Sequence, residues 1–153
     1  EGAHEAGVDV VQCTIDARQF REALDSHAMH VAGAMEALEA QYLRPLTPLS
    51  PKDADDVPRR VAILISEFLL IHPFREGNGR VAQLMGNWVA LQAGLPTINY
   101  GIDDDSDAKD AYIVALQRGY QQDYAPLEQF VRDGLERSQK ALRRLKLDPL
   151  PPG

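Results

Sequence analysis

Apolar side chains recur at helical spacing through most of the chain. The first such segment starts near residue 20 and places its apolar and partly apolar side chains on one helix face. These positions are Phe20, Leu24, His27, Val31, Met35, Leu38 and Tyr42. The prolines that follow, at positions 45, 48 and 51, predict that this helix stops near Tyr42 and that a rigid, exposed connection follows it.

Two further segments predict the centre of the fold. A second helix is expected to begin at Asp56-Val57-Pro58 and to end at His72, because the residue before a proline is disfavoured in a helix. It is apolar on nearly every face, which indicates the middle of a bundle. A third helix should follow and end near Gly94, with an apolar stripe that we expect to face the core. The stripe consists of Val81, Leu84, Met85, Trp88 and Leu91.

The remaining pattern predicts two more helices, over about residues 107–121 and 126–147. Val8–Ile15 is instead rich in β-branched residues, which predicts a strand or one arm of a hairpin. Residues 148–153 contain three prolines and should form a tail. The sequence thus predicts an all-α bundle with a small β element near its start, in a single domain over residues 1–153.

Composition narrows the choice of partners. The net charge of −7 argues against long-range attraction to nucleic acid or to an anionic membrane. No apolar run has the length of a membrane-spanning helix. The single cysteine, Cys13, fits a reducing compartment and is interpreted as a packing residue. We therefore expect a cytoplasmic protein, or one delivered into a host cytosol as part of a larger effector. The start at Glu1 is consistent with an excised domain or a processed product.

The segment between the second and third helices carries the candidate chemistry. Gly77-Asn78-Gly79-Arg80 opens a helix, whose N-terminus offers unpaired N–H groups and a partial positive charge. Glycines allow a ligand to approach the backbone closely, and Arg80 adds a forked cationic donor. This combination predicts an anion site suited to phosphate. A plain helix-to-helix turn with a surface arginine is the alternative.

Two neighbouring side chains strengthen the phosphate interpretation. His72, at the end of the apolar helix, could accept a proton from an attacking hydroxyl, or it could be a core histidine bonded to a backbone carbonyl. Glu76 could hold Mg²⁺ against bound phosphates, or it could simply favour the helix N-terminus. His27 and His30 lie three residues apart without further ligands nearby, so we interpret them as structural. The basic last helix is interpreted as a solvated face.

The run from His72 to Arg80 resembles the signature of the Fic family (filamentation induced by cyclic AMP). That signature reads His-Pro-Phe-x-(Asp/Glu)-Gly-Asn-Gly-Arg-x-x-Arg, and this chain has His-Pro-Phe-Arg-Glu-Gly-Asn-Gly-Arg. The resemblance implies a protein adenylyltransferase, which moves AMP from ATP to a Ser, Thr or Tyr hydroxyl of a target protein with the help of Mg²⁺ or Mn²⁺. A β-hairpin flap, for which Val8–Ile15 is the candidate, would align the target peptide.

The same resemblance implies a role for each motif residue. His72 would be the catalytic base, Glu76 would hold the metal, and a buried Phe74 would anchor the loop. The anion hole and the distal phosphate contact would come from Gly77, Asn78, Gly79 and Arg80.

Position 83 departs from the signature, because Gln83 replaces its second arginine. Helical spacing predicts that Gln83 lies on the same side as Arg80 and can still donate a hydrogen bond to a phosphate, without a charge. The family's inhibitory pattern, (Ser/Thr)-x-x-x-Glu-(Gly/Asn), does not occur in the chain. The usual brake would then be absent or supplied from outside the chain, for example by an antitoxin or another regulatory partner.

The change at Gln83 leaves other functions open. The same scaffold could transfer UMP, GMP or phosphocholine, although Gly77 and Gly79 favour a nucleotide donor. A nucleotide-binding pseudoenzyme is a further alternative, which the presence of His72 and Glu76 argues against.

Overall fold

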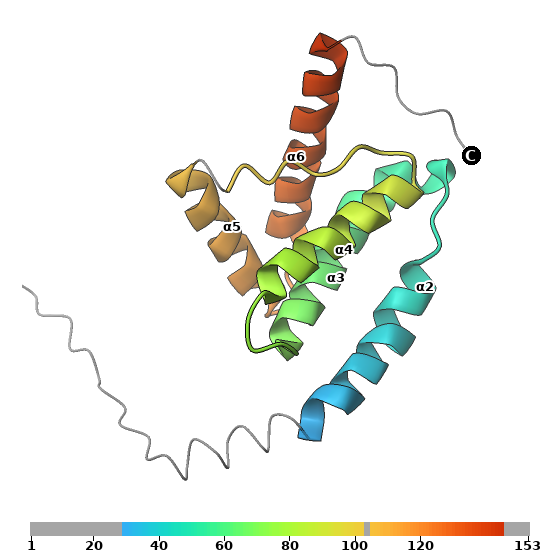
Figure 1. Cartoon of the computed structure of the whole chain (residues 1–153), viewed down its shortest axis with the longest axis vertical. Coiled ribbons are helices and arrows are strands. Elements are labelled where there is room, and N and C mark those ends of the chain that lie inside the picture. The colour runs from blue at the N-terminus through green and yellow to red at the C-terminus, as the bar shows by residue number, and fades with distance from the viewer. Residues whose placement is uncertain (1–28, 103–104, 146–153) are drawn as a thin grey trace, which may run out of the picture.

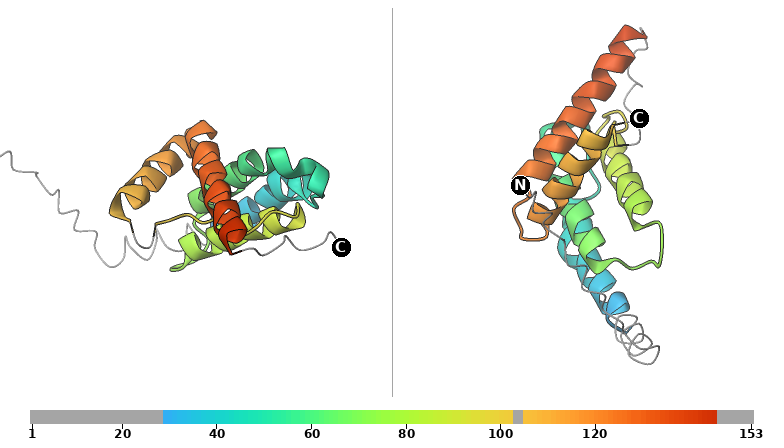
Figure 2. Two further views of the ribbon diagram at one scale, coloured as in Figure 1. Left: turned by 90° about the horizontal axis from the view of Figure 1, so that it is seen from above. Right: turned by 90° about the vertical axis from the view of Figure 1, so that its left-hand side faces the viewer.

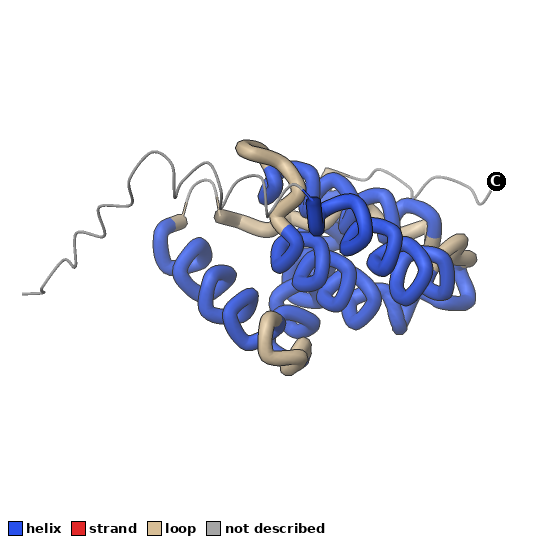
Figure 3. The backbone as a smooth tube through the Cα atoms, turned by 90° about the horizontal axis from the view of Figure 1, so that it is seen from below, coloured by secondary structure: helices blue, strands red, loops and turns tan. Residues whose placement is uncertain are grey.

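The computed structural model describes residues 29–102 and 105–145, and within these ranges every regular element is a helix (Figures 1 and 3). The all-α architecture predicted from the sequence is therefore confirmed. The candidate flap at residues 8–15, Cys13 and the tail at 148–153 lie outside the described residues. Among the helices that are described, none combines the length and apolar character needed to cross a membrane.

The described residues form a long first helix and then five further elements. The first helix comprises an α-helical stretch over 29–38, the π-helical turn η1 (Glu39–Leu43) and α2 (Arg44–Leu46), and Figure 1 labels it α2. The elements that follow are η2 (Pro51–Asp56), α3 (Val57–Ile71), α4 (Asn78–Gln92), α5 (Ser106–Gly119) and α6 (Ala125–Arg144).

The first helix continues past the point where we expected it to stop. Pro45 does not end it, and the helix runs on to Leu46. The backbone widens into a π-helical turn just before the proline, where the Arg44 N–H donates to the Glu39 carbonyl five residues earlier. Because the backbone hydrogen-bonding pattern has already shifted there, the missing N–H of Pro45 and its ring are accommodated without a break.

Helix α3 forms the centre of the molecule, as its uniformly apolar sequence predicted. It contacts α4, α5, α6, η1 and η2, and Figure 1 shows it behind α4 with the other helices around it. Its start at Val57 and its end at Ile71 also agree with the prediction. The side chains that it buries in the core include Val57, Val61, Leu64, Ile65 and Phe68.

Helix α4 buries a different face from the one that we predicted. Its buried side chains are small, namely Ala82, Gly86, Val89 and Ala90, together with Asn78 at its start. Most of the expected apolar stripe is exposed instead: Leu84 is 68 % exposed, Trp88 47 % and Leu91 51 %. The small residues allow α4 to lie close against α3, where the larger side chains of the stripe would not fit.

A linker over residues 95–102 connects α4 to α5 and crosses α6 (Figure 2). The Ile98 N–H donates to Asn87 Oδ1 on α4 at 2.8 Å. On the other side, the Asn99 N–H donates to the Gly134 carbonyl at 3.3 Å, and the Arg137 guanidinium donates to the Asn99 carbonyl. The linker therefore joins α4 to α6, although it contains no regular secondary structure.

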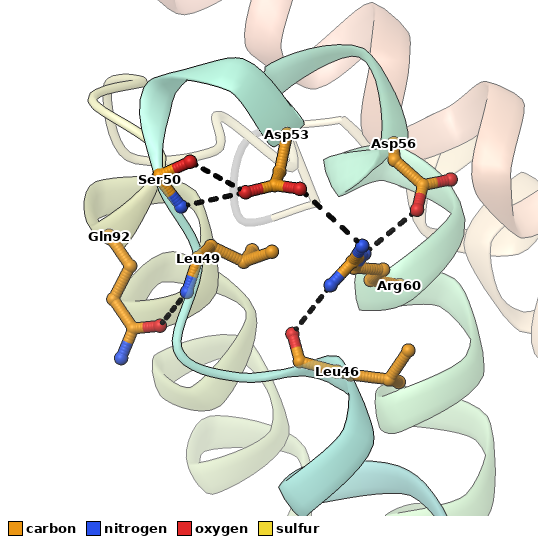
Figure 4. A network of polar contacts seen from close by, with 7 residues as sticks. All are labelled: Leu46, Leu49, Ser50, Asp53, Asp56, Arg60 and Gln92. Atoms are coloured by element: carbon orange, nitrogen blue, oxygen red, sulfur yellow. Dashed lines mark hydrogen bonds and ion pairs between the residues drawn. The ribbon is translucent and has the colours of Figure 1, made fainter.

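A polar network at the start of α3 holds the first helix in place (Figure 4). The Arg60 side chain donates to the Leu46 carbonyl at 3.0 Å and to the Asp56 carboxylate at 2.8 Å, and it lies 3.7 Å from Asp53. Hydrogen bonds from Ser50 hold the pKa of Asp53 below its ordinary value, so this carboxylate stays charged. The connection that follows the first helix is thus attached to α3 through one arginine.

The close approach at Gly134 gives the first testable prediction. A Cβ atom there would lie 2.7 Å from Ile98 Cγ2 and 2.9 Å from the Asn99 carbonyl oxygen. Because one of these atoms is backbone, Gly134→Ala should lower the free energy of unfolding by about 1–3 kcal/mol. Gly33→Ala is the matched control, since a Cβ atom meets nothing within 4 Å there. It should be neutral or stabilising by up to about 1 kcal/mol. Urea titration followed by circular dichroism measures both, and equal effects would contradict this account of the linker.

Candidate functional site

The loop between α3 and α4 begins with a backbone conformation that is unusual for its residue type. His72 caps α3 in the left-handed region, with φ 52° and ψ 56°, and its N–H donates to the Phe68 carbonyl at 3.1 Å. A side chain other than glycine in this region costs about 1–3 kcal/mol, and such strain is concentrated at functional sites. This conformation turns the chain sharply out of α3 and leaves the His72 side chain exposed.

A second left-handed residue ends the loop, and here it is a glycine. Gly77 has φ 85° and caps the N-terminus of α4, where its carbonyl accepts from the Val81 N–H at 3.0 Å. The guanidinium of Arg80 lies over it, with Nη2 3.4 Å from the place where a Cβ atom would be. Glycine therefore permits both the turn and the close packing of Arg80 against the backbone.

The side chain of Asn78 fixes the shape of the loop. It is 3 % exposed, its Oδ1 accepts from the Phe74 N–H at 2.9 Å, and its Nδ2 donates to the Phe74 carbonyl at 2.5 Å. We expected Asn78 to contribute to an anion hole, but its carboxamide is occupied by Phe74. Only its backbone N–H, at the first position of α4, could serve that purpose.

The expectation that Phe74 is buried was wrong, because its side chain is 49 % exposed. Phe68 of α3 already occupies the core below the loop, and the two ring centroids lie 6.3 Å apart. The two hydrogen bonds from Asn78 hold the backbone of Phe74 at the surface. The ring therefore lies against the edge of the core and not inside it.

The loop and the first two turns of α4 border an open hollow of about 440 Å³. It is lined by Phe74, Glu76, Gly77, Arg80, Val81 and Leu84. Both Glu76 and Arg80 are exposed, so a carboxylate and a guanidinium are available to a ligand beside the N-terminus of a helix. Its volume lies within the usual range for small-molecule sites.

Gln83 does not line this hollow, although it lies three residues after Arg80 on α4 and so on the same side of the helix, as expected. It lines a second hollow of about 230 Å³ on the neighbouring side of α4. The second hollow is formed by Gln83, Asn87, Ile98, Asn99, Tyr100, Gly101 and Ile102. Sequence reasoning identified only Gln83 among these residues, because the linker that forms the opposite wall carries no motif.

The residues around the loop indicate which kind of metal site could form there. Within residues 29–102 and 105–145, no group of three or more His, Cys, Asp or Glu side chains could hold a metal ion by itself. Magnesium commonly binds through one or two carboxylates together with substrate phosphates and water. The exposed carboxylate of Glu76, next to a phosphate-type site, fits that mode of binding and does not fit a closed protein site.

Comparison with known proteins adds to this geometry. A family model described as the Fic/DOC family matches residues 11–90, which is more than half of the chain and includes the whole loop. The chain belongs to the Fic/DOC family. The resemblance of His72–Arg80 to the Fic signature is thus confirmed at the level of the family.

Several curated relatives of this Fic chain are named as protein adenylyltransferases. This chain is 30 % identical over 126 residues to Protein adenylyltransferase Fic of Nematostella vectensis. The match covers 81 % of this chain and 29 % of that protein. The fic-1 proteins of Caenorhabditis briggsae and Caenorhabditis elegans are 30 % and 29 % identical over 60 % and 58 % of this chain. These matches cover 17 % and 16 % of the two proteins, so the chain spans less than a third of each relative. No solved structure matches it.

The role of Asn78 in the loop can be tested by its effect on stability. Asn78→Ala leaves the N–H and carbonyl of Phe74 without their partners and should lower the free energy of unfolding by about 1–3 kcal/mol. Asn99→Ala is the control, because the Asn99 side chain is exposed and makes no hydrogen bond with the described residues. It should change the free energy of unfolding by less than about 0.5 kcal/mol. Chemical denaturation measures both variants, and a small effect at Asn78 would refute its assigned role.

Proposed function

We propose that this chain is a protein adenylyltransferase, which transfers AMP from ATP to a Ser, Thr or Tyr hydroxyl of a target protein. The observation that carries the proposal is the placement of His72, Glu76 and Arg80. All three are exposed, His72 and Glu76 on the short loop before α4 and Arg80 in the first turn of that helix, in a chain of the Fic/DOC family. The names of its relatives in three animals support the same reaction.

In this proposal the phosphates of ATP lie at the N-terminus of α4. The unpaired N–H groups from Gly77 to Gly79 and the partial positive charge of the helix end stabilise the anion. Arg80, which already packs over Gly77, contributes the only formal positive charge among the side chains that line the hollow. Mg²⁺ or Mn²⁺, held by Glu76, would supply neutralisation of the phosphate charge.

His72 acts on the acceptor and not on the phosphates. Its imidazole accepts the proton of the target hydroxyl as that oxygen attacks the α-phosphorus of ATP. A bond forms between the hydroxyl oxygen and the α-phosphorus, the bond from that phosphorus to the bridging oxygen breaks, and pyrophosphate leaves. The left-handed cap that turns the chain at His72 supports this role, because it brings the imidazole out of the buried helix.

One prediction of the proposed function separates the transfer of AMP from the binding of ATP. His72→Ala should reduce transfer of label from α-phosphate-labelled ATP to protein by at least about a hundredfold, while ATP affinity changes little. His30→Ala is the matched control, since His30 is exposed on the first helix outside the loop. It should retain full activity. The same assay with labelled UTP, GTP and CDP-choline tests the alternative donors. Normal transfer by His72→Ala would remove the base from the mechanism, and binding without transfer by the natural chain would indicate a pseudoenzyme.

A second prediction concerns the metal. Glu76→Gln keeps the shape of the side chain and removes its charge, so the affinity for ATP in the presence of Mg²⁺ should fall about tenfold or more. Glu136→Gln, an exposed site on α6, should have no effect. Calorimetric titration of ATP, with and without EDTA, gives the ATP affinity in the absence and in the presence of free metal ion. If chelation and Glu76→Gln both leave the ATP affinity unchanged, the carboxylate holds no metal.

A further inference from the structure

Helix α4 has an apolar face that is exposed. It lies at one edge of the described helices (Figure 2) and packs against α3. Leu84, Trp88 and Leu91 are 68 %, 47 % and 51 % exposed. Helical geometry places them opposite the small buried residues that face α3. These three residues form the α4 seam, and contiguous exposed apolar side chains of this kind mark interaction sites.

The spacing within the α4 seam is that of a coiled coil. Its three residues are four and then three positions apart. Val81, which is partly buried, extends the alternation by one step towards the N-terminus. Alternating steps of three and four keep one side of a helix turned towards a second helix along its length. The α4 seam therefore fits another helix laid along α4.

The surroundings of the α4 seam carry no charge. Residues 81–102, which form most of α4 and the linker after it, contain no Asp, Glu, Lys, Arg or His, although 25 % of the chain is charged. The net charge of −7 therefore comes from the rest of the molecule. Two copies of such a chain repel each other over most of their surfaces, and a two-fold contact sets equivalent patches against each other. An uncharged face is where this repulsion is smallest.

The α4 seam is also complementary to itself. A two-fold axis that passes beside Trp88 pairs two α4 helices antiparallel. Leu84 of one copy then lies opposite Leu91 of the other, and the two Trp88 side chains meet near the axis. Arg80, in the first turn, comes near the C-terminal end of the second copy's helix, where the carbonyl groups are partly negative. A parallel pair would instead bring the two Arg80 side chains together.

We infer that two copies of this chain form a dimer through the α4 seam, with the two helices antiparallel. The inference does not depend on the proposed function, because it uses only the exposure, spacing and charge of α4. A second copy is favoured over an unrelated helix, because no charged residue beside the seam could select a partner by ion pairing. A contact along one 15-residue helix is small, so the dissociation constant should be on the order of 1–100 μM.

The chain contains one tryptophan, and it is the central residue of the α4 seam. The fluorescence of Trp88 therefore reports on the contact directly. Sedimentation equilibrium of the full chain, from about tenfold below to about tenfold above the dissociation constant, should show a monomer–dimer equilibrium. Over the same range the Trp88 emission should shift to shorter wavelength, and its quenching by acrylamide should decrease.

Two substitutions in the α4 seam test the contact and its direction. Leu91→Glu and Leu84→Lys each place a charge in an apolar contact and should raise the dissociation constant at least about tenfold. Val114→Glu is the matched control, because Val114 is 58 % exposed on α5. It should change the dissociation constant by less than about twofold.

An equimolar mixture of Leu91→Glu and Leu84→Lys chains sets opposite charges against each other across the antiparallel pair. It should recover most of the lost affinity. Misfolded chains could not recover in this way, and thermal unfolding of each variant measures its folding separately.

Four outcomes would overturn the inference. A chain that stays monomeric with Trp88 open to acrylamide does not pair with itself. A monomer in which Trp88 is shielded covers the α4 seam with another part of the same chain. A dimer that is unaffected by Leu91→Glu forms through another surface. If Leu91→Glu is rescued by Leu91→Lys and not by Leu84→Lys, the helices are parallel and the arrangement inferred from the seam is wrong.

Discussion

The close packing of α4 against α3 is the constraint on which the rest of the structure depends. Gly86 contributes no side chain to this contact, and a Cβ atom there would lie 2.5 Å from the Tyr100 hydroxyl and 3.0 Å from Val61 Cγ1. The same contact positions the linker, because Tyr100 reaches the core at this point. With the end of α3 and the start of α4 both fixed, the six residues from His72 to Gly77 must reverse the chain direction within one short loop.

That short loop explains why the side chains of His72 and Glu76 are exposed. The reversal uses left-handed conformations at both of its ends, His72 and Gly77, and the side chain of Asn78 fixes the backbone between them. A residue such as His72 keeps a strained conformation only where the surroundings determine it strongly. The packing of α3 against α4 fixes the backbone on both sides of the loop and so holds His72 in this conformation. The imidazole of His72 and the carboxylate of Glu76 are consequently held on a defined loop, next to the guanidinium of Arg80 in the first turn of α4, and all three side chains are exposed.

The sequence predicted the helices and the loop well, and it predicted the packing of α4 poorly. The predicted and observed bounds of α3 agree because Pro58 and Pro73 mark them. The burial of α3 could also be predicted, because the helix is apolar on nearly every face. The stripe through Trp88 was assigned to the core because large apolar residues usually lie there. The buried face of α4 is the one whose small residues let it pack close to α3, and not the one with the largest apolar side chains. Which helix packs against α4 is decided by the tertiary fold, and a single sequence does not show it. The exposure of Phe74 depends likewise on tertiary contacts with Phe68 and Asn78.

The two hollows along helix α4 differ in charge, and the electrostatics of a helix end account for the difference. The chain has a net charge of −7 and repels anions at long range, so an anionic ligand needs a local source of positive potential. The N-terminus of α4 and Arg80 provide one, but the effect of a helix dipole falls off within the first turn. Gln83 and Asn87 lie beyond that turn. Being neutral, they can discriminate only by hydrogen bonding and shape.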